Sequence, residues 1–295
     1  MAAPRSIVTG GTGYVGRFIV EAFLRAGHEV TVMGRRPPAE GFFSRAIAFV
    51  PLDLKHSAID RTAFARADFL VHGAFDHEPG KYRGGEGDDP AGFRRRNLDG
   101  SLALFDAARA AGVSRTVFLS SRAVYGPRTA GVRLAETDPA RPDTLYGEIK
   151  LEAETALRTI GGVSLRVTGV YGPAGVGKTH KWAGLFRDYL GGKPISPHVG
   201  TEVHGDDVAA AVLLVLEVGA AEAEGEIFNV SDIVVDRRDL LAIVQRQAGC
   251  QHQLPEAADV SSVNAMETAK LQSLGWRPGG AALLEKTVPA LVFTD

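Results

Sequence analysis

Two hydrophobic patterns alternate along the first half of the chain. Short runs of β-branched and aromatic residues predict strands, and the segments between them carry apolar residues at three- and four-residue spacing, which is typical of one face of a helix. Strands that alternate with helices favour an α/β fold, a doubly wound parallel sheet with helices on both faces. The expected strands are 6–9, 29–33, 47–50, 69–73, 116–120 and 163–167.

The clearest helical pattern lies between the fourth and fifth expected strands. It runs from Phe93 to Ala111 and ends before Gly112, a typical C-terminal stop. In the second half the alternation loosens, and we expect helices at 182–190, 207–218, 239–248 and 281–293 and a strand at 227–230. We therefore predict a first domain over 1–167 and a smaller C-terminal substrate-binding lobe over 168–295, with some of its elements returning to the main sheet.

A glycine-rich turn joins the first expected strand to the helix that follows it. Gly11, Gly13 and Gly16 match the G-x-G-x-x-G dinucleotide fingerprint in the strand, turn and helix setting that this motif needs. One glycine permits the sharp turn, one lets main-chain N–H groups approach a pyrophosphate, and one lets the helix pack closely on the strand. The turn predicts a Rossmann-type dinucleotide site. Its expected contacts are Gly10, Gly13, Tyr14, Val15 and Gly16.

The end of the second strand bears on which dinucleotide is bound. An NAD site usually has an acidic residue there, which accepts a hydrogen bond from the adenosine ribose 2′-OH, but this strand ends with Gly34, Arg35 and Arg36. A guanidinium fork suits the geometry of a phosphate. We therefore predict NADP, with Arg35 and Arg36 at its 2′-phosphate, and keep NAD as the alternative.

Two further segments carry groups suited to proton transfer. Tyr146 and Lys150 are four residues apart at the start of an expected helix, so the phenol and the ammonium lie on one helical face. A nearby ammonium lowers the pKa of a phenol, which can then exchange a proton with a substrate hydroxyl or carbonyl. Ser120 and Ser121 end a strand at the carboxyl edge of the sheet, where ligands of doubly wound folds bind.

Taken in order, these motifs resemble the extended short-chain dehydrogenase/reductases, the NAD-dependent epimerase/dehydratase family. The resemblance covers nearly the whole chain. It is carried by 9–16, Asp53, 71–74, 97–100, 120–126, 146–150 and 166–173.

The resemblance implies a role for each matching residue. Tyr146 would be the acid/base, Lys150 would lower its pKa and hold the nicotinamide ribose, and Ser121 would hydrogen-bond the reacting oxygen. Asn97 would support the catalytic helix. The other expected cofactor residues are Asp53, at the adenine, Leu54, and Ala74, whose segment would pass under the cofactor.

The expected reaction is NAD(P)-dependent hydride transfer at a hydroxyl or carbonyl carbon of a sugar-like or nucleotide-sugar substrate. The alternative is a nucleotide-sugar epimerase, which keeps the ketone bound and returns hydride to its other face. Dehydration is disfavoured because Arg122 and Ala123 stand where the resembled dehydratases typically carry an Asp-Glu pair. A non-catalytic, cofactor-sensing protein is a more distant alternative.

Residues 172–179 match G-x-x-x-x-G-K-[ST], the phosphate-binding loop of NTPases. A P-loop NTPase is therefore a further remote alternative, although such a loop usually follows the first strand of its own fold. A milder hypothesis is that Lys178 meets an anionic group of the substrate. The polar stretch 75–90 is expected to be a surface loop near the mouth of the site.

Composition narrows the class of protein. The 295 residues are 45% hydrophobic, enough for a large core, and no apolar run reaches the roughly 18 residues of a membrane span. A net charge of -2 argues against nucleic acid as a partner. The one cysteine, Cys250, excludes an intrachain disulfide and a cysteine-rich zinc site. We expect a cytoplasmic protein with a small-molecule substrate and no metal, and the resemblance implies a homodimer.

Overall fold

The structure is a computed structural model that describes residues 2–55, 59–78, 81 and 85–293. Its main sheet has seven strands in the order β3-β2-β1-β4-β5-β6-β9, and every pair of neighbours is parallel. This confirms the expected doubly wound Rossmann sheet, because the strand order reverses direction at β1. The strands are β1 (Arg5–Thr9), β2 (Glu29–Gly34), β3 (Ala48–Pro51), β4 (Phe69–His72), β5 (Arg115–Ser121), β6 (Val163–Val167) and β9 (Ile227–Val230).

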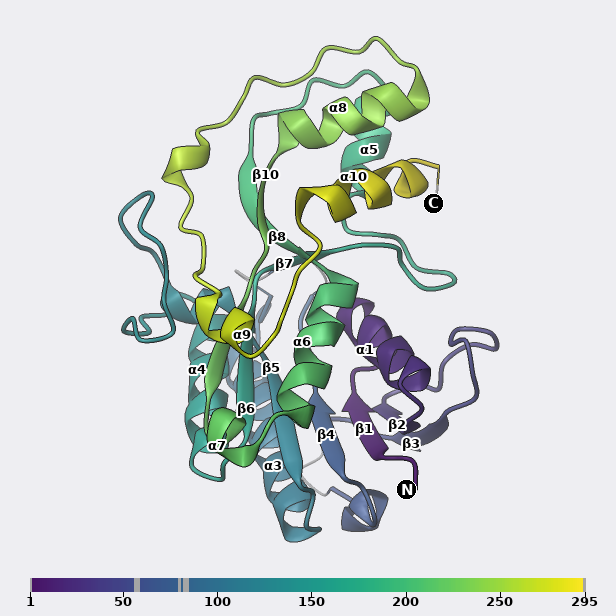
Figure 1. Ribbon diagram of the computed structural model, residues 1–295, viewed down its shortest axis with the longest axis vertical. Coiled ribbons are helices and arrows are strands. Elements are labelled where there is room, and N and C mark those ends of the chain that lie inside the picture. The colour runs from purple at the N-terminus through teal and green to yellow at the C-terminus, as the bar shows by residue number, and fades with distance from the viewer. Residues whose placement is uncertain (1, 56–58, 79–80, 82–84, 294–295) are drawn as a thin grey trace.

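Helices cover both faces of this sheet (Figure 1). On one face α1 (Tyr14–Arg25) lies beside α6 (Gly205–Glu217), and on the other α3 (Gly100–Ala110) lies beside α4 (Leu145–Arg158). Successive residues of β1 point to opposite faces, as strand geometry requires. Val8 packs with the α1 and α6 side chains, whereas Ile7 packs with Leu104 of α3.

The helical segment before β5 differs from the single helix expected over 93–111. It consists of α2 (Pro90–Arg94), a π-helical turn η2 (Arg95–Asp99) and α3. A π-turn inserts an extra residue into a helix and is frequent at functional sites. Here the inserted turn carries the fully buried Asn97, whose amide bonds to a segment distant in sequence, so its position follows from a contact that helical periodicity does not reveal.

The C-terminal lobe contains the expected helices α5 (Ala183–Leu190), α8 (Arg237–Ala248) and α10 (Gly280–Leu291). Its small sheet, in the order β10-β8-β7, was not expected, because β7 and β10 have only three and four residues and β8 contains glycine and polar residues. β9 joins the main sheet beside β6, and α6 packs against β5 and β6. The remaining elements are β7 (Gly169–Tyr171), β8 (Val199–His204), β10 (Ile233–Asp236), α7 (Ala220–Ala223), α9 (Ala269–Ser273), η1 (Arg61–Phe64), η3 (Arg122–Tyr125) and η4 (Val260–Ser262). The proposed boundary after residue 167 stays a prediction.

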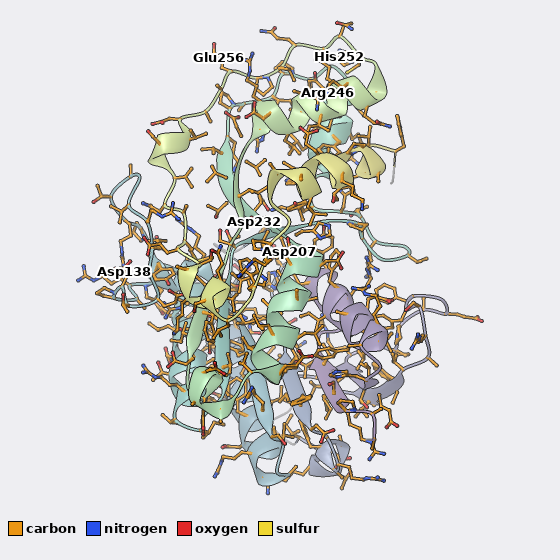
Figure 2. All side chains as sticks on the ribbon, in the orientation of Figure 1. Asp138, Asp207, Asp232, Arg246, His252 and Glu256 are labelled. Atoms are coloured by element: carbon orange, nitrogen blue, oxygen red, sulfur yellow. The ribbon has the colours of Figure 1, made fainter. Side chains whose placement is uncertain are left out.

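Two acidic side chains connect the lobe to the main sheet. Asp207 of α6 accepts a hydrogen bond from the backbone N–H of Gly279 at 3.0 Å, and Asp232, after β9, accepts one from Gly280 at 2.8 Å. Figure 2 shows both carboxylates where the upper lobe meets the end of α6. They hold the start of α10, and burial raises the pKa of Asp207 to about 6.

The raised pKa predicts how Asp207 affects stability. The folded state binds the Asp207 proton more tightly than the unfolded chain does, so this carboxyl lowers stability progressively as pH rises from its ordinary pKa of 3.8 to about 6. We therefore expect the melting temperature of Asp207→Asn minus that of the unsubstituted protein to rise as the pH is raised from 4 to 7. Thermal denaturation across that interval measures it, with the exposed Asp106→Asn on α3 as control. A pH-independent difference would contradict the expectation.

Candidate active site

The glycine turn has the geometry of an anion cradle. Gly10 takes the positive φ of 72°, and a Cβ there would lie 2.8 Å from the backbone nitrogen of Ala74. A Cβ on Gly16 would lie 2.2 Å from the carbonyl oxygen of Gly10. Gly13 is the N-cap of α1, and no side chain in the described residues caps this helix. The first-turn N–H groups of α1 therefore have no side-chain cap and suit a pyrophosphate.

The glycine roles anticipated from the fingerprint are thus distributed over four positions. Gly10 makes the turn, and Gly16 lets the helix meet it. A Cβ on Gly11 would lie 3.0 Å from the side chains of Val20 and Val32, so this residue also permits close packing of α1 on the sheet.

The segment after β7 is tied to the first turn of α1. The Tyr14 hydroxyl donates to the carbonyl oxygen of Gly172 at 2.6 Å, and Arg17 donates to that of Pro173 at 3.0 Å. Burial raises the pKa of Tyr14 to about 12. The structure thus places Tyr14 beside the glycine turn, with its hydroxyl holding the segment that carries the second glycine motif.

This second motif lacks the structural context of a phosphate-binding loop. Lys178 and Thr179 are exposed and precede α5, which begins only at Ala183, so no helix N-terminus stands where the motif needs one. The preceding strand, β7, belongs to the small sheet of the lobe. The structure does not support a P-loop NTPase.

The catalytic residues expected from sequence come together where β5 meets α4. Ser121 ends β5 and accepts a hydrogen bond from the backbone of Ala123 at 3.1 Å. The Thr144 hydroxyl caps α4, on which Tyr146 and Lys150 lie one turn apart. A Cβ on Gly147 would lie only 2.7 Å from the carbonyl oxygen of Ala123. The two backbones therefore touch, which sets the separation between Ser121 and Tyr146.

Lys150 is buried at the centre of this group, with 3% of its surface exposed. Its Nζ donates to the carbonyl oxygen of Leu119 at 2.7 Å and lies 4.5 Å from the ring centres of both Phe75 and Phe118. The Tyr146 ring centre is 5.7 Å from the same nitrogen. Burial lowers the pKa of Lys150 to about 7, against which Glu154 favours the ammonium form.

The segment after β4 supplies two rings that the sequence reasoning missed. Phe75 packs edge-on against Tyr146 with ring centres 4.9 Å apart, and the His77 ring centre lies 6.3 Å from that of Tyr146. The predicted loop 75–90 therefore does begin at the site, although 79–80 and 82–84 lie outside the described residues. The position of Phe75, just past the carboxyl end of a central strand, was the signal available in the sequence.

Asn97 holds this segment in place through its side-chain amide, and the π-turn that carries it also packs against α4. Its Oδ1 accepts from the backbone N–H of Asp76 at 2.6 Å, and its Nδ2 donates to the carbonyl oxygens of Asp76 at 2.9 Å and Phe93 at 3.0 Å. Ala74 donates its N–H to the hydroxyl of Thr9 at 3.2 Å. The backbone that would pass under the cofactor is thus fixed to β1 and to the π-turn.

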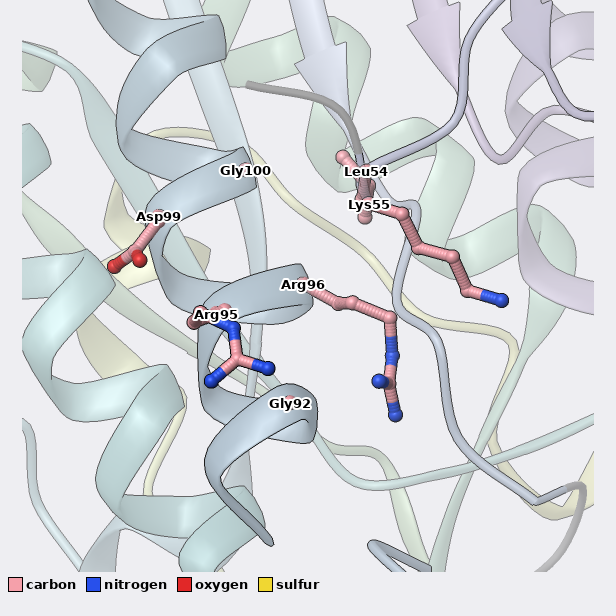
Figure 3. A pocket seen from close by; sticks show the side chains of 7 residues that line it. All are labelled: Leu54, Lys55, Gly92, Arg95, Arg96, Asp99 and Gly100. Atoms are coloured by element: carbon pink, nitrogen blue, oxygen red, sulfur yellow. The ribbon is translucent and has the colours of Figure 1, made fainter. Parts of the chain in front are cut away.

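The segment after β3 borders a cavity of about 270 Å³ with a basic lining. Asp53 accepts a hydrogen bond from the backbone of Lys55 at 3.0 Å. Figure 3 shows Leu54 and Lys55 on one side of the cavity and Arg96 on the helical segment opposite. The complete lining is Leu54, Lys55, Gly92, Arg95, Arg96, Asp99 and Gly100. The structure therefore places Asp53 and Leu54 together, at the edge expected for the adenine.

The two arginines after β2 are not equivalent. Both are exposed, and Arg35 donates from Nη1 to Oδ1 of Asp76 at 3.0 Å. The guanidinium that was expected at a 2′-phosphate therefore has a carboxylate partner.

The described residues place limits on other chemistry. None of their helices combines the length and hydrophobicity that crossing a bilayer requires. Among the same residues, no three His, Cys, Asp or Glu side chains come together as ligands for a metal. His72 is buried between the hydroxyls of Thr9 and Ser101, at 2.6 and 2.8 Å from its two ring nitrogens.

Comparisons with known proteins give the family and the fold. The model of the NAD dependent epimerase/dehydratase family matches residues 6–231. The UDP-glucose 4-epimerase of Corynebacterium glutamicum is 28% identical, over 98% of this chain and 95% of that protein. The crystal structure of the Thermus thermophilus UDP-glucose 4-epimerase in complex with NAD is 29% identical, with a TM-score of 0.79 over 99% of this chain and 100% of that one. The UDP-glucose 4-epimerase of Thermotoga maritima, with UDP-glucose, has a TM-score of 0.80 over 98% of this chain and 97% of that one; at 22% identity it shows the shared fold.

The environment of Lys150 yields a direct prediction. Because its ammonium is removed from water, we expect one lysine to titrate near pH 7, far below the ordinary value of 10.5. Nuclear magnetic resonance of the protein labelled with ¹³C at the lysine side chains measures this. The signal should be missing from Lys150→Met. Titration of every lysine near 10.5 would contradict the expectation.

Proposed function

We propose a function on the premise that this chain belongs to the NAD dependent epimerase/dehydratase family. In this proposal it is a nucleotide-sugar epimerase, which works by reversible oxidation of one sugar carbon. The observation that carries the proposal is that α4 brings Tyr146 and Lys150 against the end of β5, where Ser121 lies, and against the segment after β4, which in turn contacts the glycine turn. Similarity over nearly the full length of two UDP-glucose 4-epimerases supports the substrate class.

In this proposal the protein's residues manage the proton and the position of the reacting carbon. The Ser121 hydroxyl and the Tyr146 phenolate bind the sugar hydroxyl, and Tyr146 takes its proton as the adjacent C–H bond breaks. A bound nicotinamide dinucleotide supplies the hydride acceptor and then the hydride donor. Return of hydride to the other face of the bound ketone, with return of the proton from Tyr146, inverts the carbon and leaves no net oxidation.

Lys150 supports this proton transfer electrostatically. Its ammonium lies on the same face of α4 as the phenol and within an apolar surrounding, where a charge acts more strongly than in water. The ammonium form stabilises the Tyr146 phenolate. The buried carboxylate of Glu154 helps to keep that form populated.

Neighbouring residues support epimerisation rather than elimination. Arg122, at a position where the resembled dehydratases carry an acid, donates from Nε and Nη2 to the carbonyl oxygen of Asn264 at 3.2 and 3.1 Å. It therefore ties η3 to the C-terminal lobe. A carboxyl group that could protonate a leaving hydroxyl does not stand at that position.

We propose NAD as the coenzyme. The relative with the matching fold at 29% identity was solved with NAD, and Arg35 is paired with Asp76. The preference for NADP that Arg35 and Arg36 suggested has no support among these relatives. The homodimer implied by the resemblance stays a prediction, as does the direct contact of Asp53 and Leu54 with the adenine.

Turnover tests the proposal. With UDP-galactose as substrate we expect UDP-glucose to form without accumulation of NADH, and we expect Tyr146→Phe to lower kcat by roughly 10²- to 10⁴-fold with dinucleotide binding retained. Tyr189→Phe, which removes a hydroxyl bonded to His252 within the lobe, is the control. One NADH released for each product would identify a dehydrogenase instead. Undiminished turnover by Tyr146→Phe would exclude this tyrosine as the acid/base.

The backbone contact at Gly147 gives a second prediction. In Gly147→Ala the new Cβ would lie 2.7 Å from the Ala123 oxygen and 2.9 Å from Pro142 Cβ, so α4 must move away from η3. Because misplacement of a reacting group by about 1 Å costs roughly 10²-fold, we expect a loss of kcat of that order. The matched control is Gly184→Ala on α5, where the nearest atom is the end of an arginine side chain at 3.8 Å. Equal kcat for both variants would contradict the argument.

A further inference from the structure

One ion pair crosses the edge of the sheet where the coenzyme is expected. Arg35 directly follows β2 and Asp76 lies in the segment after β4, while β1 runs between these two strands. Their side chains meet at 3.0 Å. The pair therefore spans the carboxyl end of β1, where the glycine turn begins.

The carboxylate is the fixed half of this pair. The backbone of Asp76 is held by both polar atoms of the buried Asn97. Its second carboxylate oxygen lies 2.8 Å from Nε of Arg96, which also donates to Asp89 at 3.1 Å. The side chain of Asp76 is 27% exposed, whereas that of Arg35 is 65% exposed. A ligand at this edge therefore meets a negative charge in a set position and a guanidinium that is free to turn.

NAD and NADP differ in structure only at the 2′ position of the adenosine ribose. The end of the second strand is where a dinucleotide fold receives the adenosine ribose, which carries a neutral 2′-OH in NAD and a 2′-phosphate in NADP. A 2′-phosphate would have to take Arg35 away from Asp76 and would then lie near an uncompensated carboxylate. A 2′-OH requires neither change.

We propose that Asp76 is the residue that selects NAD over NADP, by holding Arg35 and by repelling a 2′-phosphate. The acidic group that such folds usually place at the end of β2 is here supplied from the segment after β4. The inference rests on the proposed function, since it requires that the site at the glycine turn take a nicotinamide dinucleotide, and it assigns the specificity of that same site.

Binding of NADH and NADPH to the dinucleotide-free protein, followed by nicotinamide fluorescence, tests the proposal. In Asp76→Asn, which keeps the shape of the side chain and removes its charge, we expect affinity for NADPH to rise by about tenfold or more, with that for NADH changing by less than about threefold. The gain should disappear in the double variant Arg35→Ala/Asp76→Asn, because the freed guanidinium is what binds the phosphate.

Two further variants separate this role from a structural one. Asp89→Asn breaks the other ion pair of Arg96 and leaves Arg35 with Asp76, so it should not raise NADPH affinity. Arg35→Ala alone should change NADPH affinity less than it does in the Asp76→Asn background. An unchanged NADPH to NADH ratio in Asp76→Asn, or a gain that survives removal of Arg35, would overturn the proposal while leaving the proposed function intact. Failure of the unsubstituted protein to bind either dinucleotide would overturn both.

Discussion

Contact between backbones without an intervening Cβ is the constraint on which the site depends. Gly16 brings α1 against the turn at Gly10, Gly10 brings that turn against the segment after β4, and Gly147 brings α4 against η3. Each contact is shorter than any side chain would allow, so the distances from the anion cradle to the catalytic residues are set by the main chain. The rigid sheet carries this precision from one contact to the other.

Charge buried behind the site is the second constraint. Tyr146, Lys150 and Glu154 follow one another at four-residue intervals along the sheet-facing side of α4. Glu154 accepts from Ser120 and pairs with Arg166 of β6 at 2.8 Å. Isolated buried charges are costly, whereas this series alternates ammonium, carboxylate and guanidinium. These buried groups therefore keep Lys150 away from water while the Glu154 carboxylate compensates the charge of its ammonium.

Much of this arrangement could be predicted from sequence, and the parts that could not share one cause. The strands, the glycine turn and the Tyr146 and Lys150 pair follow from local periodicity and spacing, which is information that neighbouring residues carry. The π-turn at Asn97 and the partner of Arg35 depend on contacts with Asp76, which lies 21 and 41 positions away along the chain. The expectation of NADP treated Arg35 as a guanidinium without a partner, available to a 2′-phosphate. In the folded protein the charge of Arg35 is paired with Asp76, which lies in the segment after β4.

The path of the chain after β6 bears on how such a protein can change its substrate. The chain leaves the main sheet at β7, returns to it with α6 and β9, and leaves again with β10. If the chain were divided at one point after residue 167, the first part would lack the edge strand β9 and the helix α6 that packs on α1. The lobe is therefore not a transplantable module. New specificity in this architecture would arise by remodelling individual connections rather than by shuffling whole domains.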